Sequence, residues 1–329
     1  MTTYIETKLP GDDEMMSLLV RRKIKFAEDI TLFVLMRPDR AELPPFTAGS
    51  HLLIVTPNKL SRRYSLCNAP SERYRYVVAV KRDPEGDGGS LSMTDEVAVG
   101  DTLNVSPPFN YFPLVDDATS YLLVAGGIGI TPIRSMICEL IAKEADFKLV
   151  YCTRSPEATA FLHELSSPEL AGRVLIHHDH GDRARSLALA PIVAQRTEGA
   201  HLYCCGPRPL MQAVRGLTAH WPSSSVHFED FGTSAHSEQA DGEQPFTVRL
   251  AKSGRTVEVP PAVSILEALR RHGVAVPSSC ESGTCGTCRT TLLSGLPDHR
   301  DFVLDDDEQE KAIMICVSRA KSKELVLDL

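Results

Sequence analysis

Four cysteines near the C-terminus constrain the fold of this chain more than any other feature. Cys280, Cys285, Cys288 and Cys316 follow the pattern C-x4-C-x2-C with a fourth cysteine further along, which is the ligand spacing of a plant-type [2Fe-2S] site. Glycines between the cysteines (ESGTCGTC) let backbone N–H groups approach the sulfurs without a Cβ clash. Zinc and disulfides are the alternatives, but zinc sites usually pair their cysteines as short C-x2-C knuckles. The spacing therefore predicts a small domain folded around an iron–sulfur cluster.

Length, charge and cysteine count set wider limits. A chain of 329 residues has room for two or three domains. Its formal charge of -8, from 35 Lys plus Arg against 43 Asp plus Glu, argues against a nucleic-acid binder. The chain has nine cysteines, and because disulfides use cysteines in pairs, this odd count argues against a complete disulfide framework. The sequence has neither a long apolar span nor the apolar core of a signal peptide. We therefore expect a cytoplasmic protein with no membrane or nucleic-acid partner.

The order of strand and helix patterns divides the chain into segments. Up to residue 116, short strands at 30–36, 51–56 and 76–82 are separated by turns, which predicts an antiparallel β-barrel. From 117 to 232, strands alternate with helices, which predicts a parallel sheet covered on both faces. The strands of this α/β segment are expected at 121–125, 148–153, 174–178, 201–205 and 226–228.

A polar, acidic stretch at 233–244 is predicted to be a linker. In the last segment, 245–329, strands at 246–250 and 256–259 flank a KSGR turn, which predicts a hairpin. Ser264 and Glu267 then form a capping-box pattern before a helix that ends at Gly273.

A glycine-rich turn follows the first strand of the α/β segment. Gly126, Gly127 and Gly129 would let the backbone approach a pyrophosphate, while Thr131 suits an N-cap and Pro132 the first helical position. The alternative is tight strand-to-helix packing, because the sequence is not G-x-G-x-x-G. The run Cys-Gly-Pro at 205–207 ends another predicted strand, so it would lie at the same ligand-binding edge.

The tetrapeptide Arg-Arg-Tyr-Ser at 62–65 supplies the residue types of a flavin site. Tyr64 could pack the ring, Arg62 could bind phosphate, and Ser65 could lie near the reactive edge. The alternative interpretation is an exposed basic turn, which would have the same residue types. Downstream, Gly-Gly-Ser at 88–90 could cradle a phosphate or form an ordinary turn.

Together, the runs RRYS, GGIGITP and YCCGP resemble the ferredoxin-NADP reductase superfamily, and the C-terminal cysteine motif narrows the resemblance to the phthalate dioxygenase reductase family. The resemblance covers essentially the whole chain and implies an FMN barrel, an NADH-binding α/β domain and an α+β, β-grasp [2Fe-2S] domain of the plant ferredoxin type, in that order. The implied FMN contacts are Arg62, Tyr64, Ser65, Ala79, Val80, Lys81, Gly88, Gly89, Ser90, Thr131 and Phe231. The implied NADH contacts are Gly126, Gly127, Thr153, Arg154, Cys205, Gly206 and Pro207.

The resemblance implies a redox converter that works as a monomer. NADH would give a hydride to FMN, and single electrons would pass through the cluster to a separate Rieske-type oxygenase. Ser65 and Cys205 would orient flavin and nicotinamide at the point of transfer. The alternatives are the reductase of an aromatic O-demethylase or monooxygenase, and a non-catalytic iron–sulfur electron carrier.

Three further features leave alternatives open. The run HHDH at 177–180 could bind a metal, but adjacent strand residues point to opposite faces. Seven acids against one arginine at 298–310 could dock a basic partner or form a solvated loop. Asp179 would repel a 2′-phosphate, which favours NADH over NADPH.

Overall fold

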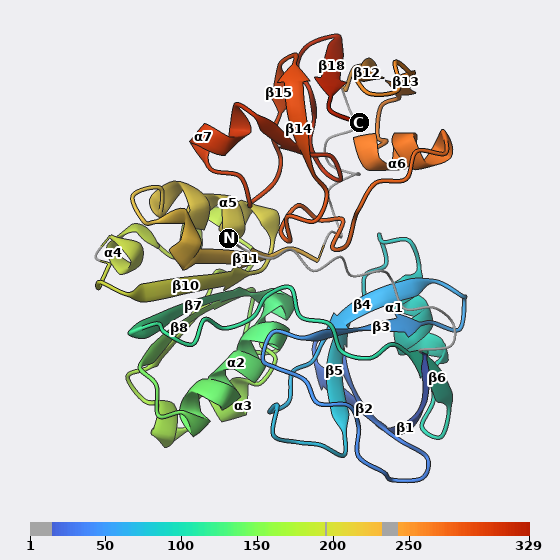
Figure 1. The fold of residues 1–329 in the computed structure, drawn as a ribbon. Helices are drawn as coiled ribbons and strands as arrows, with labels where there is room; N and C mark the ends of the chain where they lie inside the picture. Colours follow the sequence, from blue (N-terminus) through green and yellow to red (C-terminus); the bar gives the residue numbers. More distant parts are fainter. Residues whose placement is uncertain (1–14, 195, 232–242) are drawn as a thin grey trace. The chain divides into compact units, whose positions relative to one another are not determined.

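The computed structural model describes residues 15–194, 196–231 and 243–329. They divide into two compact units, which we call the N-terminal unit (up to Glu229) and the C-terminal unit (from Asp230). Figure 1 shows the elements of each. In the part of the chain described, no helix is long and apolar enough to cross a membrane.

A six-stranded antiparallel barrel opens the N-terminal unit. Its strand order is β4-β3-β6-β1-β2-β5, and a bridge between Leu66 and Val78 joins the two edge strands. Alternating residues such as Leu18, Phe33 and Val80 fill its interior, as the period of two in a strand requires. The strands are β1 (Met16–Ala27), β2 (Ile30–Met36), β3 (His51–Val55), β4 (Ser61–Ser65), β5 (Tyr76–Lys81) and β6 (Thr102–Val105). The predicted barrel is confirmed.

A five-stranded parallel sheet follows, in the order β11-β10-β7-β8-β9. Helices cover both of its faces (Figure 1), because buried parallel strands need cover on each side. The strands are β7 (Ser120–Gly126), β8 (Phe147–Thr153), β9 (Val174–His178), β10 (Ala200–Cys205) and β11 (Val226–Glu229), and the helices are α2 (Ile130–Ala142), α3 (Leu162–Leu165), α4 (Ala190–Val193) and α5 (Arg208–Leu217). All five strands lie within a residue or two of their predicted positions.

The start of α2 differs from the prediction. Its N-cap is Gly129, which has no side chain to cap with, and Thr131 lies inside the first turn, where its hydroxyl donates to the Ile128 carbonyl at 3.0 Å. A 3-10 turn over Gly127–Gly129 runs directly into the helix. The helix therefore begins before Pro132, and the predicted N-cap at Thr131 is wrong because the glycine turn supplies the first helical bonds itself.

One hydrophobic core joins the barrel to the parallel sheet. Ile30 and Ala79 on the barrel's outer face belong to the same cluster as Ile133 and Tyr203. Arg134 of α2 links the two parts further, because it donates to the Cys67 carbonyl and pairs with Glu164 at 2.9 Å. The two predicted segments therefore form one compact unit.

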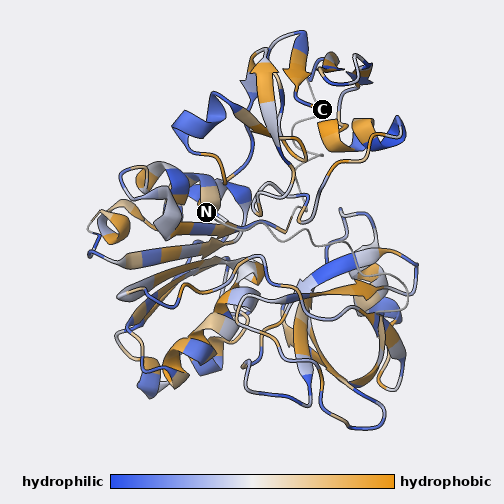
Figure 2. Ribbon diagram, in the orientation of Figure 1, coloured by the Kyte–Doolittle hydropathy of each residue, from blue (hydrophilic) through white to orange (hydrophobic). Residues whose placement is uncertain are grey.

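The C-terminal unit is a five-stranded mixed sheet in the order β13-β12-β18-β14-β16, covered by α6. Strands and helix carry hydrophobic residues toward a shared core, whereas α7 (Asp306–Gln309) is hydrophilic along its length (Figure 2). The other elements are β12 (Phe246–Leu250), β13 (Thr256–Val259), α6 (Ile265–Arg271), β14 (Arg289–Ser294), β15 (Pro297–Asp298), β16 (Ala312–Met314), β17 (Arg319–Ala320) and β18 (Glu324–Leu327). The predicted hairpin and helix are present.

Half of the predicted capping box forms in α6. The Ser264 hydroxyl accepts from the Glu267 N–H at 3.1 Å, and the helix ends before Gly273, whose φ is +70°. The Glu267 carboxylate instead pairs with Arg271 one turn later. Its ion pair thus replaces the reciprocal backbone bond.

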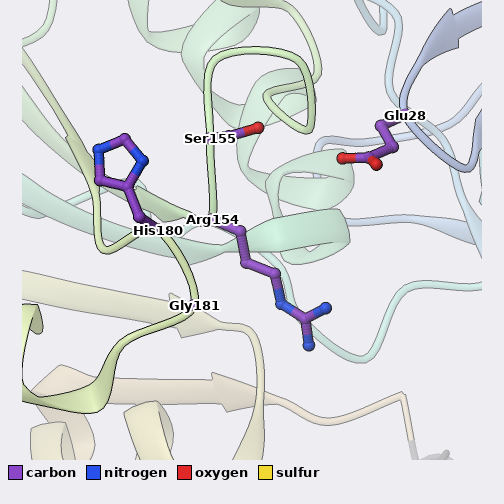
Figure 3. Close-up of a pocket in the computed structure, with 5 residues that line it drawn as sticks. All are labelled: Glu28, Arg154, Ser155, His180 and Gly181. Atoms are coloured by element: carbon purple, nitrogen blue, oxygen red, sulfur yellow. The ribbon is translucent and has the colours of Figure 1, made fainter.

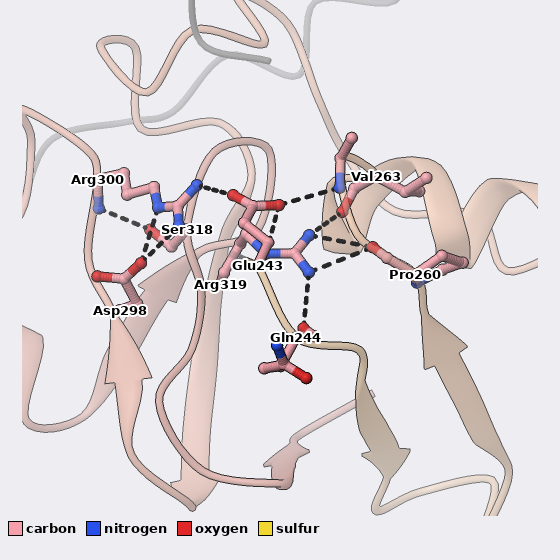
Figure 4. A network of polar contacts seen from close by, with 9 residues as sticks. Glu243, Gln244, Pro260, Val263, Asp298, Arg300, Ser318 and Arg319 are labelled. Atoms are coloured by element: carbon pink, nitrogen blue, oxygen red, sulfur yellow. Dashed lines mark hydrogen bonds and ion pairs between the residues drawn. The ribbon is translucent and has the colours of Figure 1, made fainter. Parts of the chain in front are cut away.

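The predicted linker, 233–244, lies outside the described residues up to 242. Its last two residues are anchored in the C-terminal unit (Figure 4). The buried Glu243 carboxylate pairs with Arg300 at 2.7 Å and Arg319 at 3.2 Å, and it accepts the Ala262 N–H at 2.9 Å. Arg319 also donates to the Gln244 carbonyl at 3.2 Å. The start of β12 is therefore fixed by charge as well as by strand pairing.

Candidate flavin, nucleotide and iron–sulfur sites

The carboxyl ends of the parallel strands gather the predicted nucleotide residues. Cys205 lies beside Ala125 in the sheet, and Thr153 lies beside His178. A Cβ on Gly126 would lie 2.6 Å from Pro207 Cδ, and one on Gly206 would lie 2.9 Å from Gly126 Cα. The two turns therefore touch through glycines. Gly127 has a φ of +52°, and no heavy atom lies within 4 Å of the position that a Cβ would take. Its backbone can therefore approach a phosphate, as a glycine turn at a helix N-terminus is suited to do.

Two of the predicted nucleotide side chains are occupied within the protein. The Thr153 hydroxyl is buried and lies 2.7 Å from Thr159 Oγ1 and 2.8 Å from His178 Nδ1. Cys205 is fully buried. The Thr153 hydroxyl is therefore engaged inside the protein and Cys205 exposes no surface, whereas Arg154 lines an open cavity.

Strand β4 places the predicted flavin side chains at one place on the barrel. Arg62 lies against the turn at 88–89, because a Cβ on Gly89 would lie 2.5 Å from its Nε, and its guanidinium pairs with Asp87. The Tyr64 hydroxyl is buried without a hydrogen-bond partner among the described residues, and burial raises its pKa to about 12. A buried unpaired phenol beside a cation and a glycine turn suits a polar aromatic cofactor with a phosphate.

The other predicted flavin contacts fall into three groups. Val80 points into the barrel core, which leaves its backbone for a cofactor, while Ala79 faces the sheet and Lys81 is exposed. The Ser90 hydroxyl is bonded to the backbone of Asp83 at 3.0 Å. Thr131 is buried, and Phe231 belongs to the C-terminal unit, where 37% of its surface is exposed.

Glu229 joins the flavin strand to the nucleotide sheet, and the sequence analysis missed it. The Ser65 hydroxyl donates to the Glu229 carboxylate at 3.5 Å. Glu229 ends β11 and lies beside Cys205 in the sheet. The contact spans 164 positions of sequence, so no local pattern could have revealed it.

The four cysteines form two pairs. A hydrogen bond between Cys280 and Cys285 holds the pKa of Cys280 well below its ordinary value and raises the pKa of Cys285. A hydrogen bond to Cys288 likewise raises the pKa of Cys316, and the charges of the other two cysteines add to that effect. Backbone N–H groups also point at sulfur, from Cys280 to Cys285 Sγ at 3.4 Å and from Ser282 to Cys280 Sγ at 3.5 Å.

This donor set fits a two-iron cluster. Two thiol pairs match the two irons of a [2Fe-2S] cluster, each of which takes two cysteines. A Cβ on Gly283, whose φ is +80°, would meet Val317 Cγ2 at 2.7 Å, so the loop can close on the Cys316 segment only with glycine there.

The remaining motifs have local roles. His177 Nε2 lies 2.7 Å from the Arg185 carbonyl, and His180 lines the same cavity as Arg154. In the acidic stretch, Asp305 and Glu308 form a capping box for α7. The Asp301 carboxylate is buried and accepts backbone N–H groups at 2.8 and 3.0 Å. Part of the acidity therefore shapes the loop.

Comparison with known proteins agrees with these sites. Residues 123–216 match the model of the oxidoreductase NAD-binding domain, and residues 248–321 match that of the 2Fe-2S iron-sulfur cluster binding domain. The chain is 53% identical to phthalate dioxygenase reductase of Burkholderia cepacia, covering 97% of this chain and 99% of that one. It is 52% identical to a phthalate 4,5-dioxygenase oxygenase reductase subunit of Pseudomonas putida, covering 97% and 98%.

A solved structure has a similar fold over nearly the whole chain. It is that of a phthalate dioxygenase reductase, described as modular for electron transfer from pyridine nucleotides to [2Fe-2S]. Its TM-score is 0.71 at 53% identity, covering 97% of this chain and 99% of that one. The chain therefore belongs to the phthalate dioxygenase reductase family, whose members carry FMN and a [2Fe-2S] cluster and draw electrons from NADH.

Proposed function

We propose that this protein is the NADH-dependent reductase component of a two-component, phthalate-type aromatic-ring dioxygenase. The observation that carries the proposal is the contact between Ser65 and Glu229 at 3.5 Å. The contact joins β4, which we propose to hold the flavin, to the end of β11, beside the proposed nicotinamide site at Cys205. Hydride transfer requires such proximity between donor and acceptor rings.

The chain's own residues would bind and orient the reactants. A bound FMN would supply the conversion of a two-electron hydride donor into single-electron transfer, which is chemistry that amino-acid side chains lack. Arg62 and the turn at 88–90 would hold the flavin phosphate, and Tyr64 would pack against the flavin. Ser65, paired with Glu229, would present its hydroxyl to the flavin edge, and Cys205 would support the nicotinamide ring from its buried position at the end of β10.

We further propose three domains, at 1–116 for FMN, 117–232 for NADH and 245–329 for the cluster, with 233–244 between the last two. The cluster ligands would be Cys280, Cys285, Cys288 and Cys316. Their pairing and the N–H groups aimed at sulfur support this assignment.

The partner would be a Rieske-type oxygenase, and the reductase would act as a monomer in the cytoplasm. A plant-type [2Fe-2S] centre transfers single electrons at low potential, which suits an acceptor of this kind. None of the nine cysteines is joined in a disulfide, which supports work in a reducing compartment.

An anaerobic titration with NADH tests the proposal. In the purified holoprotein, flavin absorbance should bleach, and an electron paramagnetic resonance signal of a reduced [2Fe-2S] cluster should then appear. The variant Cys285→Ser should lose the cluster signal and keep flavin reduction, because it removes one ligand. Cys138→Ser, which changes a half-buried thiol of α2, is the matched control and should behave as wild type. A cluster that dithionite reduces but NADH does not would overturn the proposed function.

A further inference from the structure

A cavity of about 570 Å³ opens at the carboxyl edge of the parallel sheet (Figure 3). Arg154 and Ser155 enter it from the loop after β8, and His180 and Gly181 enter it from the loop after β9. The fifth lining residue, Glu28, comes from the barrel, in the turn between β1 and β2. The cavity therefore joins the nucleotide sheet to the flavin barrel.

The strand order assigns this cavity to one half of the dinucleotide. The glycine turn after β7, which suits the pyrophosphate, lies at the middle of the order β11-β10-β7-β8-β9. The nicotinamide must reach the flavin on the β10–β11 side, where Glu229 contacts Ser65. The adenosine half must then extend the other way, across the ends of β8 and β9, because ligands of open parallel sheets follow this edge. That path leads into the cavity.

The backbone of Glu28 is held firmly at the cavity. Its N–H donates to the Glu157 carbonyl at 2.8 Å, in the loop that follows Arg154. Two residues earlier, the Phe26 ring packs on Phe161 with 4.8 Å between centroids. The side chain is exposed, and its carboxylate points toward Ser155 (Figure 3). The barrel thus anchors the backbone that carries this carboxylate beside the adenosine path.

A carboxylate at this place would discriminate between the two nicotinamide coenzymes. In dinucleotide-binding sheets, a carboxylate commonly accepts from the ribose 2′-hydroxyl of NADH and disfavours the 2′-phosphate of NADPH. Asp179, the residue expected to do this, is not among the cavity's lining residues, and its Oδ1 accepts the Gly181 N–H at 2.8 Å. Arg154 by itself would attract a 2′-phosphate, so the cavity needs an opposing charge to prefer NADH.

We propose that Glu28, supplied by the flavin barrel, determines the preference for NADH by binding the adenosine ribose and opposing a 2′-phosphate. The inference rests on the proposed function, since it concerns the coenzyme of the same reaction. It assigns a specificity residue to a domain other than the one that binds the nucleotide.

The test compares Glu28→Gln and Glu28→Lys with Asp29→Asn, a change in the same turn at a residue outside the cavity lining. Two readouts are used in the holoprotein: kcat/KM for flavin reduction by NADPH relative to NADH, and inhibition by 2′,5′-ADP relative to 5′-AMP. We expect Glu28→Gln to raise the NADPH to NADH ratio about tenfold, as the loss of one nearby like charge predicts, and Glu28→Lys to raise it further. Binding of 2′,5′-ADP should tighten in parallel, and Asp29→Asn should leave both readouts unchanged.

Two results would overturn the inference. In one, both ratios stay at the wild-type value in both Glu28 variants while NADH still reduces the flavin. In the other, Asp29→Asn shifts the ratios as much as Glu28→Gln, which would assign the effect to general surface charge. Failure of the proposed function is separate and visible, because NADH would then fail to reduce the flavin of the wild-type protein.

Discussion

Arg62, the cation expected to bind the flavin phosphate, is paired with Asp87 inside its own barrel. The hydrogen bond from Arg62 holds the pKa of Asp87 below its ordinary value, so Asp87 is ionised at neutral pH and competes with phosphate for Arg62. We therefore expect Asp87→Asn to tighten FMN binding by about two- to fivefold, which is the range that one exposed ion pair is worth. Quenching of flavin fluorescence on titration into the flavin-free protein measures the affinity.

The control for this prediction is Glu85→Gln, an exposed acid in the same loop, which should leave FMN affinity unchanged. High salt should shrink the difference between Asp87→Asn and wild type, because screening weakens the competing pair. Weaker FMN binding by Asp87→Asn would mean that Asp87 holds Arg62 in its binding position, which contradicts the prediction.

At the scale of elements, Glu243 ties the start of β12 to Arg300, just after β15, and to Arg319 in β17 (Figure 4). Burial opposes its ionisation, but hydrogen bonds from Arg300 and the Ala262 N–H outweigh that cost, so its pKa lies below the ordinary value of 4.5. Removing this negative charge leaves the guanidinium groups of Arg300 and Arg319, which are partly buried, without the carboxylate that pairs with them. We expect Glu243→Gln to lower the free energy of unfolding of the C-terminal unit by about 1–3 kcal/mol at neutral pH.

The stability that Glu243 contributes should depend on pH. A lowered carboxyl pKa stabilises the fold above about pH 4.5, and that stability is lost as pH falls through the folded-state pKa. The difference in unfolding free energy between wild type and Glu243→Gln should therefore shrink as the pH falls below about 5. Urea-induced loss of the cluster's visible circular dichroism measures stability, and Glu258→Gln, an exposed change on β13, controls for acid lability of the cluster. A constant gap between the variants down to pH 4 would contradict this account.

At the scale of the whole molecule, the shared core predicts that barrel and parallel sheet unfold together. Arg134 bridges them, and its guanidinium also lies 4.7 Å from the centroid of the Phe161 ring. We expect Arg134→Ala to lower the free energy of unfolding of the N-terminal unit by about 2 kcal/mol, through lost charged hydrogen bonds. Trp221, the one tryptophan of the chain, is buried in the parallel-sheet half, and the flavin would report on the barrel half. Both signals should therefore give the same urea midpoint, because the two halves form one unit.

Two comparisons decide this last prediction. Arg183→Ala, at an exposed turn, should not shift the midpoint, and the cluster signal of the C-terminal unit should be unaffected by either variant. Separate midpoints for Trp221 and flavin would mean that the proposed domains 1–116 and 117–232 unfold independently.

Local chemistry made much of the molecule predictable from sequence. The cysteine spacing identified the cluster ligands to be tested, and alternation placed β2 and β9 at their observed bounds. Ser264 and Gly273 marked the ends of α6. These features depend on residues within one turn or one strand of each other, where backbone geometry and side-chain periodicity act directly.

What the sequence alone determined was therefore the type of each domain and most strand positions, and it predicted candidate residues for each cofactor. Only the tertiary structure brought Ser65 to Glu229, Glu28 to Arg154, Asp87 to Arg62 and Glu243 to its two arginines. It also moved the start of α2 to Gly129. Such contacts depend on how separate elements pack, because a side chain's charged partner is selected by distance in space, and sequence separation carries no information about that distance.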